Sequence, residues 1–121
     1  MVDGLTERII GAAIEVHRLL GAGLLESIYE EALCHEFDLR GIRYQRQVDV
    51  DVIYKERVIK GQRLDLLVEK EVVVELKSLQ TVPEFATAQI LSYLRATGLK
   101  RGLLINFGKG RLADGVKRFS M

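Results

Sequence analysis

The segment from Val72 to Leu79, VVVELKSL, constrains the fold of this chain more than any other stretch. Its three consecutive valines predict a strand in the interior of a β-sheet. The same strand carries Glu75 and Lys77, which point to one face because side chains alternate along a strand. Burying a charge is costly unless the charge is paired or binds a metal ion. The strand is therefore either stabilised by a salt bridge on a wet face or part of a functional site.

The composition is that of one globular domain. The chain has 121 residues, of which 48% are hydrophobic and 29% charged, enough to bury a core without a disulfide or a structural metal. Cys34 is the single cysteine, which fits a reducing cytoplasm, and we interpret it as a small apolar residue on a helix. The sequence has no run of roughly 18 apolar residues and no signal-peptide pattern, so we expect a cytoplasmic protein with no membrane partner.

Charge is unevenly distributed, although the net formal charge is only +1. Residues 95–121 hold seven basic side chains and one acidic side chain, whereas residues 1–94 hold eleven basic and sixteen acidic ones. A basic end on an acidic body is typical of a protein that touches a polyanion, and equally of a solvated basic surface. The candidates for nucleic-acid phosphate contacts are Lys109, Arg111, Lys117 and Arg118.

Hydrophobic periodicity divides the chain into helices and strands. A helical period predicts helices over residues 5–20 and 24–39, separated by Gly21 and Gly23. A period of two predicts strands over residues 44–54, 57–68 and 72–78, the second kinked at Gly61. Pro83 precedes a predicted helix over residues 84–96, residues 101–108 read as a buried strand, and the last ten residues fit either a helix or a strand. This order predicts a single α/β domain over residues 1–121 with a mixed sheet.

A second acidic residue, Asp65, lies on the preceding predicted strand. If residues 69–71 form a three-residue turn, Asp65 lies opposite Glu75, with the two Cβ atoms roughly 5 Å apart. A two-residue turn without a bulge would instead send Asp65 to the other face. The turn contains no glycine, so the sequence leaves both registers open.

Two carboxylates this close repel each other unless a cation lies between them. Asp65, Glu75 and the backbone carbonyl of Leu76 would supply oxygen ligands of the kind that Mg²⁺ or Mn²⁺ prefers. Lys77 would then orient a water molecule or offset charge in a transition state. The alternative is an ion pair that merely stabilises the face of the strand.

Two further motifs place polar groups near this strand. Gln89 and Tyr93 share one helix face at i and i+4, where they could reach the carboxylates or a phosphate, or form an ordinary half-buried surface. Gly23, Glu26 and Tyr29 mark the start of the second helix. Glu26 there is either a further metal ligand or a favourable charge in the first turn of the helix.

Asp65 followed by Glu75-Leu76-Lys77 resembles the signature of the PD-(D/E)XK nuclease superfamily, with Leu64 in place of the usual proline. Gln89 and Tyr93 resemble a motif of the RecB-like and lambda-exonuclease-like members. The motif G-x-x-E-x-x-Y over residues 23–29 is similar to the one that names the GxxExxY proteins. The likeness extends from Thr6 to about Phe119, and the motifs occur in the expected order.

This resemblance implies an αβββαβ, restriction-endonuclease-like core with a mixed four-stranded sheet flanked by helices. It implies Mg²⁺- or Mn²⁺-dependent hydrolysis of phosphodiester bonds in DNA, and homo-oligomers occur among the relatives. The catalytic residues would be Asp65, Glu75, Lys77, Gln89 and Tyr93, and the metal ligands Glu26, Asp65, Glu75 and the Leu76 carbonyl.

Two questions stay open at the level of sequence. RecB-like nucleases place a metal-binding histidine before the Asp motif, so His17 is a further candidate ligand, or else a polar residue at a helix end. The chain is also too small for a separate DNA-recognition domain. A module that binds nucleic acid or a partner protein without cutting is therefore the alternative function on the same fold.

Overall fold

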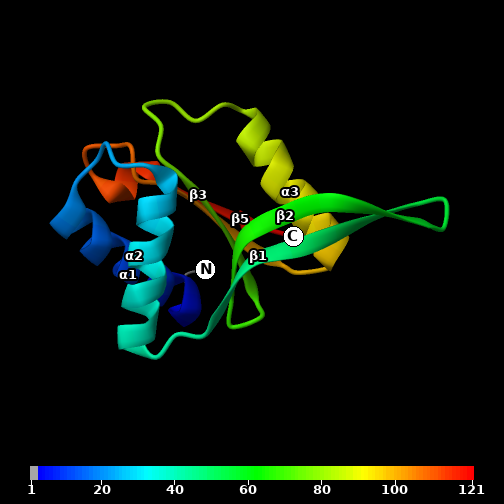
Figure 1. The fold of residues 1–121 in the computed structure, drawn as a ribbon, viewed down its shortest axis with the longest axis horizontal. Helices are drawn as coiled ribbons and strands as arrows, with labels where there is room; N and C mark the ends of the chain where they lie inside the picture. The colour runs from blue at the N-terminus through cyan, green and yellow to red at the C-terminus, as the bar shows by residue number, and fades with distance from the viewer. Residues whose placement is uncertain (1–2) are drawn as a thin grey trace.

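The apolar stripes in the first forty residues form two α-helices that pack together. The computed structural model of the chain describes residues 3–121, with α1 over Gly4–Leu20 and α2 over Glu26–Arg40 (Figure 1). Helix α1 begins after Asp3, whose carboxylate accepts a hydrogen bond of 2.8 Å from the backbone N–H of Thr6. Helix α2 ends at Gly41, which adopts the left-handed conformation that favours glycine.

The strands form one five-stranded sheet in the order β1-β2-β3-β4-β5. Their bounds are Tyr44–Tyr54, Arg57–Val68, Val72–Lys77, Arg101–Asn106 and Val116–Ser120, with α3 over Phe85–Thr97. β3 and β4 are parallel because α3 connects them across the sheet, and the other pairs are antiparallel. The predicted α/β class with a mixed sheet is confirmed. The prediction of four strands is wrong by one, because the unassigned C-terminal residues form β5 at the edge beside β4.

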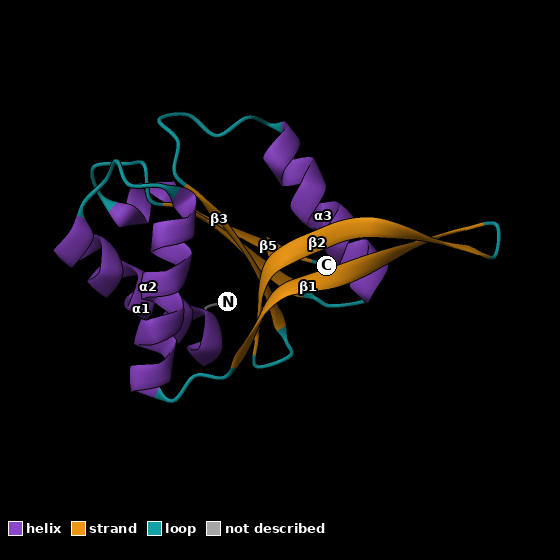
Figure 2. Ribbon diagram, in the orientation of Figure 1, coloured by secondary structure: helices purple, strands orange, loops and turns teal. Residues whose placement is uncertain are grey.

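The helices cover opposite faces of the sheet. Figure 2 shows α1 and α2 on one side and α3 on the other. Residues Val72, Val74 and Leu76 of β3 pack in the cluster with α1 and α2, whereas Val73 packs in the cluster with α3. β3 is therefore buried on both faces, which explains its unbroken apolar run. No helix within residues 3–121 is both long enough and apolar enough to cross a lipid bilayer.

The hairpin of β1 and β2 passes from one face of the sheet to the other. Tyr44 and Leu66 pack toward α1 and α2, whereas Val48 and Leu64 pack toward α3, although each pair differs by an even number of residues. The change of face occurs where Gln47 adopts a positive φ of 51° between the pairs Arg46↔Leu66 and Val48↔Leu64. Asp65 is thus at the point where β2 turns over.

The outer part of the hairpin is bent at Gly61, as predicted. Gly61 has a φ of 123°, and the register of β1 against β2 shifts between Val50 and Val52. Beyond this bulge the hairpin extends past α3 and away from the rest of the sheet (Figure 1).

Candidate active site

The register that brings Asp65 to Glu75 is the one with a three-residue turn. The pairs Val68↔Val72, Leu67↔Val73 and Leu66↔Val74 align β2 with β3. The turn forms without glycine because Glu69 and Lys70 themselves adopt positive φ angles of 51° and 58°. The next residues along this alignment are Asp65 and Glu75, which therefore lie opposite each other.

At Asp65 and Glu75, hydrogen bonds from backbone N–H groups to side-chain carboxylates join β2 to β3, in place of backbone–backbone bonds. The N–H of Asp65 donates to Glu75 Oε1 at 2.9 Å, and the N–H of Leu76 donates to Asp65 Oδ2 at 2.8 Å. Each carboxylate is thus fixed by a backbone donor of the opposite strand. Such reciprocal bonds hold the pair in one arrangement without help from a ligand.

The pair is buried, and its electrostatics reflect that burial. Glu75 is only 4% exposed. Burial first, and then the charge of Asp65, raise the pKa of Glu75 to about 8. Burial also raises the pKa of Asp65, against the hydrogen bond from Leu76 N–H, which lowers it. Two carboxyls in this setting retain a proton near neutral pH, and a cation placed between them would substitute for that proton.

The donor set fits a small, hard cation. The N–H of Leu76 points toward Asp65, so its carbonyl faces the same way, whereas the carbonyl of Lys77 accepts a 2.8 Å hydrogen bond from Phe107 N–H on the opposite side. Two carboxylates and one carbonyl are oxygen ligands suited to Mg²⁺ or Mn²⁺, with water filling the remaining positions.

The predicted cage of three carboxylates is not assembled. No three His, Cys, Asp or Glu side chains within residues 3–121 lie close enough together to hold a metal ion. Glu26 is nevertheless near the pair. Burial raises its pKa, the charge of Lys77 opposes that rise, and the charge of Asp65 adds to it. Glu26, the first residue of α2, therefore lies within electrostatic range of Asp65 and Lys77 but, within residues 3–121, does not complete a cluster of three ligands.

The Lys77 side chain shares a face with Glu75, and its ammonium has no ion-pair partner within residues 3–121. The alternative interpretation, in which Lys77 forms an ion pair that merely stabilises the face of β3, is therefore not supported by the described residues. The ammonium is instead available to a water molecule or an anionic substrate.

Helix α3 places Tyr93 against the strand that carries Asp65. Its hydroxyl donates to the carbonyl of Arg63 at 3.0 Å, two residues before Asp65. Burial, followed by the charges of Glu75 and Asp65, raises the pKa of Tyr93, and the neighbouring Gln89 side chain lowers it. Tyr93 thus lies within electrostatic range of the pair, while its hydroxyl supports β2.

Tyr29 and Gly23 hold the turn that leads to Glu26. The Tyr29 hydroxyl donates to the carbonyl of Gly21 and accepts a 3.2 Å hydrogen bond from the N–H of Leu24. Its ring stacks on Phe107 with a centroid distance of 4.4 Å. Gly23 has a φ of 103°, which a side chain would disfavour. The glycine and the tyrosine of this motif therefore shape the entry to α2, and the glutamate between them is its polar member.

His17 is not brought to the carboxylates. A ring N–H at Nε2 donates to the carbonyl of Lys109 at 2.9 Å, and the ring stacks on Phe107. The histidine therefore joins the end of α1 to the loop after β4. Among the residues that the structure describes, no ligand cluster includes His17, so it is not part of the proposed site.

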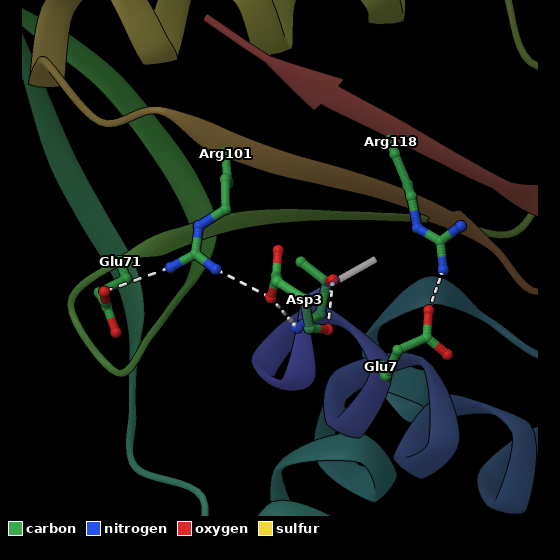
Figure 3. Close-up of polar contacts among 6 residues, drawn as sticks. Asp3, Glu7, Glu71, Arg101 and Arg118 are labelled. Atoms are coloured by element: carbon green, nitrogen blue, oxygen red, sulfur yellow. Dashed lines mark hydrogen bonds and ion pairs between the residues drawn. The ribbon is translucent and has the colours of Figure 1, made fainter. Parts of the chain in front are cut away.

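The four predicted phosphate contacts fall into two groups. Arg118 pairs with Glu7 of α1, beside Arg101, which bridges Asp3 at 2.8 Å and Glu71 at 3.2 Å (Figure 3). The Lys109 ammonium donates to the carbonyl of Gln80 at 2.7 Å. Arg111 and Lys117 are exposed, with no ion pair within residues 3–121.

Asn106 is a buried polar residue that the sequence analysis missed. Its amide donates to the carbonyl of Leu79 at 2.8 Å and accepts from the N–H of Leu79 at 3.0 Å. It thereby fixes the segment that follows Lys77. The one sequence signal was an amide side chain at the end of the otherwise apolar run GLLIN.

Two carboxylates on adjacent strands, followed by a lysine two residues on, define a class of α/β proteins built around an Asp…Glu-x-Lys constellation. A model of the PD-(D/E)XK nuclease superfamily matches residues 3–119, and the chain belongs to that superfamily. The crystal structure of SSO0001 has a similar fold, with a TM-score of 0.51 and 19% sequence identity over 98% of this chain and 78% of SSO0001. None of the curated proteins matches the sequence significantly.

Proposed function

We propose that the chain is a Mg²⁺- or Mn²⁺-dependent nuclease that hydrolyses phosphodiester bonds in DNA in the cytoplasm. Within the superfamily we assign it to the GxxExxY proteins, near the RecB-like and lambda-exonuclease-like branch, on the motifs at residues 23–29 and at Gln89 and Tyr93. The observation that carries the proposal is the buried Asp65–Glu75 pair, cross-linked by backbone N–H groups and followed by Lys77, which has no ion-pair partner within residues 3–121.

Each residue has a role that follows from its position. Asp65, Glu75 and the Leu76 carbonyl would hold the metal ion, which when bound polarises a phosphate and lowers the pKa of a coordinated water. Lys77 would donate hydrogen bonds to the attacking water or to a phosphate oxygen as negative charge develops. Glu26 would adjust the charge near Lys77, and Tyr93 with Gln89 would hold β2 in place beside the phosphate.

Cleavage of labelled DNA in a Mg²⁺ or Mn²⁺ titration tests the proposal. Asp65→Asn keeps an oxygen for the N–H of Leu76 but removes the charge, and we expect it to reduce cleavage by at least about a hundredfold. Lys77→Arg keeps the charge but spreads it over a planar group, and we expect a similar loss. Lys55→Ala, at the tip of the β1–β2 hairpin, is the control. Unchanged cleavage by Asp65→Asn would contradict the proposal.

The second candidate is a module that binds nucleic acid or a partner without cutting. It is favoured by one observation, the failure of Glu26 to join Asp65 and Glu75 in a cluster of three ligands within residues 3–121. For this function we expect DNA binding with no cleavage under any divalent metal ion.

A further inference from the structure

A hollow of about 450 Å³ lies directly beside the proposed active site. The turn between α1 and α2 forms one wall, and the segment after β3 forms the other. Its lining residues are Ala22, Gly23, Leu24, Leu25, Glu26, Ser78, Leu79, Gln80 and Gly108. Glu26 lines the hollow and lies within electrostatic range of Asp65 and Lys77, so an occupant of the hollow would lie next to the proposed catalytic groups.

The walls of the hollow are fixed before any ligand binds. The Ser78 hydroxyl donates to the carbonyl of Leu24 at 2.6 Å and joins the two walls. The Asn106 amide holds both backbone groups of Leu79. Gly108 packs so closely that a Cβ there would lie 2.1 Å from the carbonyl oxygen of Leu79. A site with this many internal bonds is pre-organised for its ligand.

The surface that the hollow presents is mostly apolar. Leu25 is 73% exposed, Leu79 41% and Leu24 39%. The backbone N–H and C=O groups of Leu24 and Leu79 already have partners within the protein. These residues therefore offer van der Waals contact to an occupant and few free hydrogen-bonding groups. A cation stands close by, because the Lys109 ammonium bonds the carbonyl of Gln80 in the wall.

We infer that this hollow takes the base of an unpaired nucleotide next to the phosphate that is cut. The inference rests on the proposed function, which brings a phosphodiester to Asp65 and Glu75. A nucleic acid combines a charged backbone, suited to Lys77 and Lys109, with bases whose flat faces can make van der Waals contact with the leucines. A base within an intact duplex is stacked and paired, so it could enter only after extrusion. The preferred substrate is therefore a single strand or a frayed end, read without regard to base identity.

Binding measurements test this inference separately from cleavage. Three labelled DNA probes are used, each with Mg²⁺. They are a short single strand, a single strand of the same length and sequence that lacks one base beside the bound phosphate, and a blunt duplex. The protein carries Lys77→Ala, so that the DNA stays intact. We expect Leu25→Ala and Leu79→Ala to weaken binding of the complete single strand about three- to tenfold and to leave duplex binding unchanged. Loss of the base should weaken binding to the parent protein but not further weaken binding to Leu25→Ala.

The matched control is Leu39→Ala. Leu39 is 69% exposed, like Leu25, but lies near the opposite end of α2. The Lys77→Ala protein that also carries Leu39→Ala should bind every probe as tightly as the Lys77→Ala protein alone. If Leu25→Ala and Leu39→Ala behave alike, while Asp65→Asn made without Lys77→Ala still reduces cleavage at least about a hundredfold, the inference is wrong and the nuclease stands. If no variant binds or cuts any DNA, the proposed function fails as well. A change in oligomeric state with Leu25→Ala, without a change in DNA binding, would instead make the hollow an interface between copies and overturn the inference.

Discussion

At the scale of single residues, the Glu75 carboxyl combines burial with a close acidic neighbour. Its pKa rises from an ordinary value of 4.5 to about 8, and burial raises the pKa values of Asp65 and Glu26 in the same direction. Such a carboxyl does not stabilise the metal-free fold when it is ionised. The Glu75 carboxyl instead keeps a proton, and a cation that binds at the site must displace that proton.

The raised pKa of Glu75 predicts a stability that falls with rising pH. Between about pH 4.5 and pH 8 the folded form holds a proton that the unfolded form has lost, so the free energy of unfolding decreases as pH rises through this range. We expect the metal-free protein, kept in EDTA, to melt at a lower temperature near pH 8.5 than near pH 5.5. Thermal unfolding followed by circular dichroism measures this directly. Glu75→Gln, which stays neutral, should weaken the dependence, and an equal slope in both proteins would contradict the assignment.

At the scale of elements, the proposed site depends on where β3 ends. Asn106, which is 1% exposed at the end of β4, bonds both backbone groups of Leu79, and Phe107 N–H bonds the carbonyl of Lys77. The parallel neighbour β4 thus fixes the segment that leaves β3. The position of Lys77 is therefore determined as much by β4 as by its own strand.

Replacing Asn106 tests this dependence. Asn106→Ala would remove the side-chain partner of both the N–H and the C=O of Leu79, and we expect a loss of about 1–3 kcal/mol in the free energy of unfolding. Urea denaturation measures the loss, with Gln45→Ala, an exposed amide on β1, as the control. Asn106→Asp should also destabilise the fold, because a carboxylate cannot donate to the Leu79 carbonyl. If Asn106→Ala is as stable as Gln45→Ala, the bonds to Leu79 contribute nothing.

At the scale of the whole molecule, the local patterns in the sequence predicted most of the elements but not how they meet. The local patterns were enough to predict β2 and β3, but the register between them stayed open because the turn at residues 69–71 contains no glycine. β5 was missed because its five residues, VKRFS, are too few and too polar to show a period. The crossing of the hairpin at Gln47, and the failure of Glu26 to complete a three-ligand cluster within residues 3–121, depend on tertiary packing, which no local pattern encodes.

Tertiary contacts that the sequence pattern does not reveal also change the interpretation of the basic C-terminal region, residues 95–121. The excess of positive charge in residues 95–121 predicted phosphate contacts, but the fold already pairs Arg118 with Glu7 on α1, whereas Arg111 stays exposed. Each phosphate contact releases counterions on binding. Loss of one contact therefore reduces the magnitude of the negative slope of log association constant against log salt concentration by about one. We expect Arg111→Ala and Lys117→Ala to reduce this slope for DNA binding.

Arg118→Ala is the matched control, because it removes an arginine whose charge is already neutralised by Glu7. Its slope should equal that of the parent protein in a salt titration followed by fluorescence anisotropy. If all three variants reduce the slope equally, the ion pair with Glu7 opens on binding and the whole basic end of the sheet acts as the nucleic-acid surface. If none does, the positive charge of this region is solvated surface, and the phosphates are held by Lys77 and the metal ion alone.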